Sequence, residues 1–197
     1  MIRDRIIQTA GSLFAQKGIN SVSMEQIAER AGVSEKSLYA EFTGMADLLE
    51  ECLNREITKI ETGISTAQSV SQSVLETLIL VMYVAFKEKS DFCTAFYEDL
   101  SKYPATRKHL AIFNMKVQNS CASYFMKCME EGFFVTNENQ ERMALIYMEE
   151  ICSLATKYQH TMIKTLIKGI CTPKGLNEAA RIQTVLEINI NRISNLK

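Results

Sequence analysis

The stretch from Ser23 to Phe42 constrains the fold of this chain more than any other part of the sequence. Ser23 is a residue type that caps helices, and Gln26 follows three positions later, which predicts a capping box at the start of a short helix. Gly32 tolerates a positive φ, and Ser34 is placed to begin a second helix. Two helix starts this close leave room only for a sharp turn, so the stretch predicts a helix-turn-helix.

The residues around this turn resemble the TetR family of bacterial transcriptional regulators. The shared pattern reads I-x-x-A-x-x-L-F-A-x-K-G from Ile7 to Gly18, S-x-x-x-I-A-x-x-A-G-V-S from Ser23 to Ser34, and L-Y-x-x-F from Leu38 to Phe42. The resemblance covers residues 3 to about 55. It implies an all-α fold of about nine helices, with an N-terminal three-helix DNA-binding domain over residues 1–45 and its helix-turn-helix at 23–42. A C-terminal helical domain for regulation, ligand binding and dimerisation would occupy residues 46–197.

Apolar residues recur at helical spacing along most of the remaining chain, which predicts an all-helical protein without reference to any family. The first helix is expected over Arg3–Lys17, and a helix from Ala46 to about Ile64 should link the two domains. Polar residues from Thr66 to Ser73 predict an interruption after it. Further helices are expected over 75–86, 91–100, 104–131 and 143–166, and from about Leu176 to the end.

The apolar runs, the cysteines and the histidines of the sequence indicate which classes of protein to expect. The longest apolar run, Leu78 to Phe86, has nine residues, too few to span a bilayer, so we expect a cytoplasmic protein with no membrane partner. The six cysteines lack C-x-x-C spacing and predict reduced core residues, with a redox sensor or a zinc site as the alternative. His109 and His160 fall on different helices, and the sequence contains no phosphate loop, H-E-x-x-H or G-x-S-x-G. We therefore expect no enzyme, no cofactor and no metal.

The resemblance also implies which side chains contact operator DNA. Ser34, Lys36 and Ser37 stand at the start of the second helix of the motif, and Tyr39 stands where the family usually places a tyrosine that contacts phosphate. The other two implied phosphate contacts are Ser23 and Thr43. For each of these side chains, simple exposure to solvent is the alternative.

The charge of the N-terminal region argues against strong DNA binding. Residues 1–50 carry five basic and seven acidic side chains, whereas DNA readers usually have a basic surface that neutralises phosphates. Two of the acidic residues, Glu35 and Glu41, lie in the expected recognition helix itself. We therefore expect modest affinity with a shallow salt dependence; alternatively, Glu35 accepts a hydrogen bond from a cytosine amino group and adds specificity.

The family resemblance implies a homodimer formed by the last two helices and an effector that releases the operator. The function it implies is a ligand-responsive regulator, a repressor, that binds a palindromic operator. The alternative is a small-molecule-binding dimer of the same fold with weak DNA binding. Candidate effector contacts are aromatic and sulfur-containing side chains of the middle helices, for which ordinary core packing is the alternative: Met82, Phe86, Phe96, Tyr97, Phe113 and Tyr124.

Overall fold

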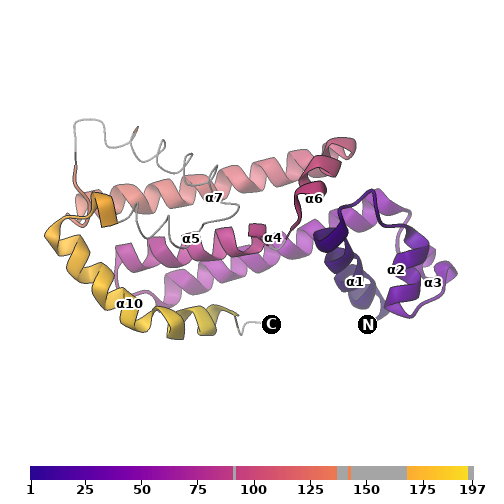
Figure 1. Ribbon diagram of the computed structural model, residues 1–197, viewed down its shortest axis with the longest axis horizontal. Coiled ribbons are helices and arrows are strands. Elements are labelled where there is room, and N and C mark those ends of the chain that lie inside the picture. The colour runs from indigo at the N-terminus through magenta and orange to yellow at the C-terminus, as the bar shows by residue number, and fades with distance from the viewer. Residues whose placement is uncertain (91, 137–141, 143–167, 195–197) are drawn as a thin grey trace. The chain divides into compact units, whose positions relative to one another are not determined.

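The structure, a computed structural model, describes residues 1–90, 92–136, 142 and 168–194 (Figure 1). Apart from one isolated antiparallel bridge between Phe134 and Cys171, the described residues form only helices, which confirms the all-α fold. In chain order the helices are α1 (Ile2–Lys17), α2 (Met24–Ala31), α3 (Glu35–Glu41), α4 (Met45–Val70), α5 (Val74–Ser90), α6 (Thr94–Asp99), the 3-10 helix η1 (Leu100–Lys102), α7 (Pro104–Glu130) and α10 (Pro173–Ser194).

The chain forms two compact units. The first consists of Met1–Lys59 with Asp91–Asn114, and the second of Ile60–Ser90 with Met115–Lys197. The first unit therefore contains more than the predicted residues 1–45, because α6 packs against α1 and brings a distant segment of the sequence to it. The functional division at residue 45 stays a prediction.

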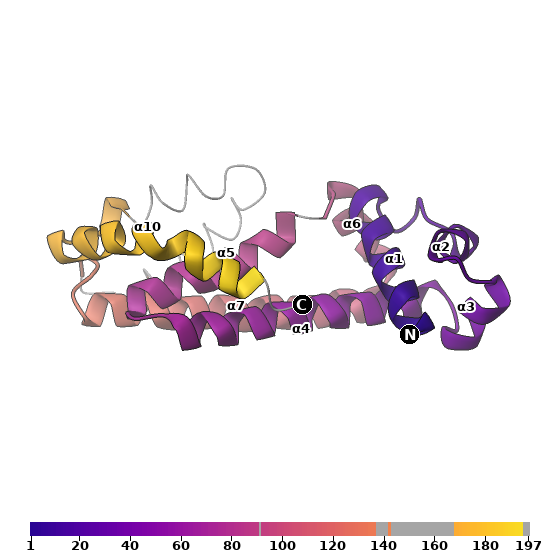
Figure 2. The same ribbon diagram turned by 90° about the horizontal axis from the view of Figure 1, so that it is seen from below.

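The first unit is built around the apolar face of α1. Ile6 and Phe14 are fully buried, and they share one cluster with Ile27 of α2 and Leu38 of α3. Figures 1 and 2 show α2 between α1 and α3 at one end of the chain's path. Burying such a side chain stabilises the fold by about 2 kcal/mol. This packing stabilises α2 and α3, which at eight and seven residues are too short to be stable alone.

The linking helix continues past its predicted end. Polar residues from Thr66 to Ser73 were expected to interrupt the helical pattern, but α4 runs to Val70 and the break falls only after it. The Thr66 hydroxyl donates to the Thr62 carbonyl (2.9 Å), and the Ser71 hydroxyl donates to the Ala67 carbonyl (2.5 Å). Short hydroxyl side chains can satisfy themselves on the preceding helical turn in this way, so a polar run does not by itself end a helix.

The last helix begins three residues before its predicted start at Leu176. Pro173 occupies its first position, where the missing N–H of proline costs nothing, and the Thr172 hydroxyl accepts from the Gly175 N–H (3.1 Å) as a cap. The helical pattern before it breaks at Cys171 and Thr172, directly before Pro173. The helix predicted over 143–166 lies outside the described residues. The short helix predicted over 91–100 is observed as α6 from Thr94.

The described cysteines are free thiols in apolar surroundings. Cys52, Cys121 and Cys128 are buried, whereas Cys93 and Cys171 are half-buried. Burial raises the pKa of Cys52 to about 12, so this thiol stays protonated at neutral pH. Among the residues that the structure describes, no cluster of side chains could hold a metal ion, and no helix is long and apolar enough to cross a membrane.

Candidate functional site

The turn between α2 and α3 has the geometry that the sequence predicts. Gly32 has a φ of 62° and a ψ of 42°, in the left-handed region. The Gly32 N–H donates to the Glu29 carbonyl and the Val33 N–H donates to the Ala28 carbonyl, both at 3.0 Å. This pair of bonds is a Schellman motif, which ends α2 and redirects the chain within two residues. The angle between the two helices is therefore fixed by backbone hydrogen bonds.

The start of α2 is closed by the predicted capping box. The Ser23 hydroxyl accepts from the Gln26 N–H, and the Gln26 side chain accepts from the Ser23 N–H, both at 3.1 Å. Ser23 is exposed and its hydroxyl proton has no acceptor among the described residues, so it can still donate to a phosphate.

Helix α3 presents one polar face and one apolar face. Its cap is Ser34, whose hydroxyl accepts from the Ser37 N–H (3.1 Å) and lies 2.8 Å from the Ser37 hydroxyl. Leu38 is fully buried in the core of the first unit. Lys36 and Tyr39 are exposed on the other face, Tyr39 to 52% of its area. The structure thus brings Ser34, Lys36, Ser37 and Tyr39 to one accessible surface, which we call the α3 face.

Thr43 is already hydrogen-bonded within the protein, which the sequence does not indicate. Its N–H and its hydroxyl both donate to the same carboxylate oxygen of Asp47, at 2.8 and 3.2 Å. The hydroxyl proton is therefore already used within the protein. A phosphate contact by Thr43 requires this bond to be exchanged, and such a contact stays a prediction.

Two of the basic side chains of this region are held by the protein itself. The Arg3 guanidinium lies 3.7 Å from the Glu41 carboxylate and 3.2 Å from that of Glu51, and it sits over the Phe42 ring. Arg5 donates to the Gly32 carbonyl (3.3 Å). These bonds pair the charge of Glu41 and hold the Arg3 side chain along the protein surface, where 42% of it stays exposed. Among the described residues, Lys36 forms no ion pair, which leaves it as the cation of the α3 face.

A contact that sequence reasoning missed lies on the opposite end of α1. Gly18 has a φ of 81° and ends α1 so close to α6 that a methyl group there would come within 2.9 Å of the Ala95 side chain. The Asn20 N–H donates to the Asp99 carboxylate (2.7 Å), and the Asn20 side chain donates to the same carboxylate. We call these contacts the α6 anchor. The only sequence signal was Gly18 itself, since nothing in the pattern points to a partner some 80 positions away.

The six candidate effector contacts are divided between the two units. Phe96 is buried in the core of the first unit, 4.4 Å from the Phe92 ring and 5.4 Å from the Tyr97 ring, and Phe113 also belongs to that unit. Met82 is buried in the second unit. The hydroxyl of Tyr124 in that unit accepts from Gln68 (2.9 Å). The side chain of Phe86 lies outside the described residues. A ligand-binding role for these six residues stays a prediction.

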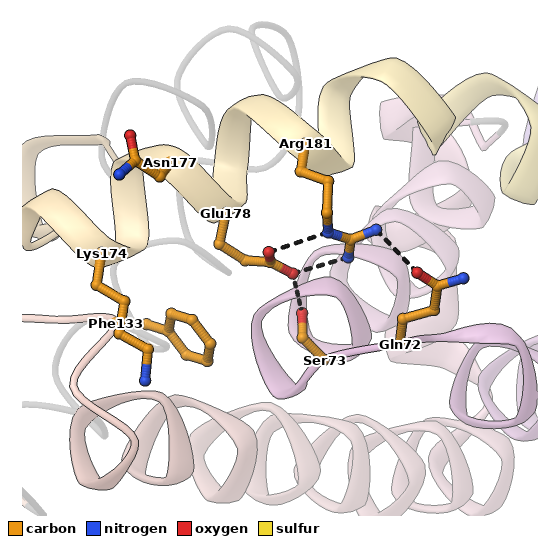
Figure 3. A pocket seen from close by; sticks show the side chains of 7 residues that line it. All are labelled: Gln72, Ser73, Phe133, Lys174, Asn177, Glu178 and Arg181. Carbon is orange, nitrogen blue, oxygen red and sulfur yellow. Dashed lines mark hydrogen bonds and ion pairs between the residues drawn. The ribbon is translucent and has the colours of Figure 1, made fainter.

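The described part of the second unit contains a pocket of about 620 Å³ that none of these residues lines (Figure 3). It lies between the turn that precedes α5, the segment after α7, and the first turns of α10. Most of the residues that line it have polar or charged side chains: Gln72, Ser73, Phe133, Lys174, Asn177, Glu178 and Arg181.

One wall of this pocket is an ion-pair network. Arg181 donates to Glu178 (2.7 and 3.0 Å), to the buried Glu76 (2.7 Å) and to Gln72 (3.1 Å). The Ser73 hydroxyl donates to Glu178 (2.5 Å). The hydrogen bond from Arg181 lowers the pKa of Glu178, so this carboxylate is ionised at neutral pH. The pKa of Arg181 is raised by the same partners.

The residues of the α3 face lie in a region that matches a known protein family. The family model for bacterial regulatory proteins of the tetR family matches residues 6–52, which span α1, α2, α3 and the start of α4. Over these residues the chain matches the TetR family. The matched residues include the capped helices and the glycine turn described above. The solved structures named below share the helical fold of this chain.

One curated relative is an uncharacterized HTH-type transcriptional regulator, YuxN of Bacillus subtilis. It is 34% identical over 90 residues, which cover 44% of this chain and 31% of the relative. The match therefore spans about a third of that protein's length.

Two solved structures share the fold over most of their length. The ketosteroid transcriptional regulator KstR2 of Mycobacterium tuberculosis is 16% identical, with a TM-score of 0.65 over 86% of this chain and 95% of that chain. A regulator from Saccharomonospora viridis, solved in complex with choline, is 17% identical, with a TM-score of 0.69 over 82% of this chain and 85% of that chain. These relatives are described as regulators and not as enzymes.

Proposed function

We propose that this TetR-family protein is a transcriptional regulator, a repressor, that binds a palindromic operator through the α3 face. The observation that carries the proposal is the division of α3: Leu38 is buried in the core while Lys36 and Tyr39 are exposed beside a fixed turn. A short helix held in this way can enter a major groove with its first turn at the base edges. The hydroxyls of Ser23 and Ser34 and the start of α3 would contact phosphates.

The proposed operator complex is a homodimer formed through the last two helices. Of these, α10 is described, and it exposes Leu176 and Ile188 to 44% and 54% of their areas. Exposed apolar side chains on one helix support a two-fold interface, because pairing with a second copy would cover them. Two α3 faces related by such an axis would read half-sites about one helical turn apart, near 34–36 Å.

The proposed control is a small-molecule effector that binds one state of the protein better than the other. One fold neighbour was solved in complex with choline, which supports small-molecule binding by this fold. The linking helix α4, predicted over Ala46–Ile64 and observed over Met45–Val70, would carry the change in spacing between the two reading heads. The effector lowers operator affinity only by its differential affinity for the two states. The curated relatives include an activator as well as repressors. The first point to test is therefore whether the effector releases the protein from its operator.

The proposal is tested by fluorescence anisotropy with duplex DNA from the chain's own upstream region. Lys36→Ala should weaken binding about tenfold and reduce the salt slope by about 1.8, because a dimer loses two phosphate contacts. Lys17→Ala is the matched control, since it removes the same charge from the exposed end of α1. Equal effects of the two substitutions would contradict the proposed role of the α3 face.

A second candidate function is a small-molecule-binding dimer that binds DNA weakly. The bonds that Arg3 and Arg5 form within the protein, added to the acidic composition of residues 1–50, favour it. The same titration separates the two functions, because the second predicts equally weak binding to upstream and scrambled DNA. A salt slope of about ten or more would show that the charge argument is wrong.

A further inference from the structure

Two oppositely charged residues on α10 face the same pocket and do not pair with each other. Lys174 and Glu178 are four positions apart, so they lie on one face of the helix, one turn from each other. A lysine and a glutamate at this spacing commonly form an ion pair. Here Glu178 pairs with Arg181, as Figure 3 shows, and Lys174 donates to the Glu131 carbonyl.

Lys174 is held by groups that do not neutralise its charge. Its ammonium donates to the Glu131 carbonyl (2.5 Å) and lies 4.5 Å from the centre of the Phe133 ring. An ammonium has three N–H donors, and two of these have no acceptor in the described part of the chain. Within that part, Lys174 also forms no ion pair. One wall of the pocket therefore carries an uncompensated positive charge.

The other wall carries an excess of negative charge. Arg181 lies between two carboxylates, those of Glu178 and the buried Glu76, so this triad has a net charge of −1. Each oxygen of a carboxylate can accept two hydrogen bonds. Among the described residues, Oε1 of Glu178 accepts from Ser73 and Arg181, whereas Oε2 accepts one bond, from Arg181. Oε2 thus keeps room for one more donor.

We propose that this pocket binds a small zwitterionic amino acid, with its carboxylate at Lys174 and its ammonium at Glu178. The charges of the two walls are complementary to such a ligand and leave any singly charged ligand with one wall unmatched. The amide of Asn177, which makes no hydrogen bond to the described residues, adds a neutral donor and acceptor at the rim. As an effector, this ligand would act through the proposed regulator function, on which that part of the inference rests. Binding itself does not depend on it.

The network gives a physical route from the pocket to the rest of the second unit. Glu76 near the start of α5 also accepts from Asn189 of α10 (2.7 Å), and both residues are buried. A ligand ammonium at Oε2 of Glu178 would share that oxygen with Arg181 and weaken the bond from Arg181. A ligand in the pocket would thus alter the hydrogen bonds that join α5 to α10.

The test measures binding to the full chain by isothermal titration calorimetry in the absence of DNA. The probes are glycine, β-alanine and 4-aminobutyrate, whose two charges are separated by one, two and three methylene groups. Butyrate and butylammonium are the matched single-charge controls for 4-aminobutyrate. We expect at least one zwitterion to bind about tenfold more tightly than both controls, because it gains two charge-assisted contacts instead of one.

Two variants locate the site. Lys174→Gln should remove the preference for the zwitterion over butylammonium, and Lys174→Glu should reverse it. Lys127→Gln is the control, since Lys127 is also exposed and also lies over an aromatic ring, that of Tyr124, outside the pocket. Far-UV circular dichroism checks that each variant folds.

The inference is overturned if none of the three zwitterions binds at concentrations up to about 10 mM, or if Lys127→Gln weakens binding as much as Lys174→Gln. Equal binding of butyrate or butylammonium would also overturn it. Zwitterion binding without any change in operator affinity would instead leave the site in place and contradict the proposed release mechanism.

Discussion

Two glycines of the N-terminal unit, Gly18 and Gly32, lie where a helix ends and the chain turns, and we call them the glycine corners. They differ in the atoms that surround them. Gly18 and Gly32 each end a helix, and both have a positive φ. Gly32 faces open space, because a methyl group there would meet no atom within 4 Å. Gly18 is packed against α6, and the same methyl group would overlap Ala95 and the Asp99 carboxylate. One glycine is therefore needed for its backbone conformation alone, and the other also for its lack of a side chain.

The substitution with the largest expected effect is Gly18→Ala. Its φ of 81° and ψ of 166° fall in a region that only glycine adopts readily, and the added methyl group displaces α6. We expect the free energy of unfolding to fall by about 2–4 kcal/mol, measured by urea denaturation.

Gly11→Ala is the matched control for that measurement. Gly11 lies within α1 with nothing near its added methyl group, so alanine should stabilise the helix by about 0.5–1 kcal/mol. A Gly18→Ala variant as stable as the native protein would show that the α6 anchor is not a tight contact.

Gly32→Ala should destabilise the unit less, by about 1 kcal/mol, because only the left-handed backbone conformation is penalised. Gly32→Asn should cost less still, since asparagine tolerates this conformation. Thermal unfolding of the two variants beside Gly18→Ala measures the difference between the corners. If alanine costs the same at both positions, the comparison is wrong.

Asp99→Ala removes the hydrogen bonds of the α6 anchor and leaves both glycines in place. It deletes both hydrogen bonds from Asn20, and such bonds contribute about 0.5–1.5 kcal/mol together at an accessible site. We expect local loss of protection at the Asn20 amide in hydrogen exchange, with α2 and α3 unaffected. Loss of protection throughout α3 would show that the anchor also holds the α3 face.

The two corners also show how far the sequence could predict this structure. The Gly32 turn and both serine caps were predicted correctly, because each depends on residues within a few positions of one another. The α6 anchor and the pocket beside Arg181 depend on residues about 80 and 105 positions apart, and no local pattern encodes such pairs. The misplaced start of α10 and the extension of α4 had local causes, in the tolerance of proline at a first helical position and of hydroxyl side chains within a helix.

The smallest expected change in stability comes from Ser34→Asp on the α3 face. Aspartate caps a helix as well as serine, and its charge is favourable at a helix N-terminus, so the free energy of unfolding should stay within about 0.5 kcal/mol of the native value. Ser34→Ala instead loses the cap and should cost about 1 kcal/mol. The expected order of the two variants is reversed for DNA affinity, because aspartate places a negative charge beside the phosphates that Ser34 is proposed to contact. We therefore expect Ser34→Asp to be stable but to bind DNA more weakly than Ser34→Ala, measured by anisotropy against the same duplex. An order of affinities that follows stability instead would mean that Ser34 only caps α3, and that the exposed corner, like the buried one, serves the fold alone.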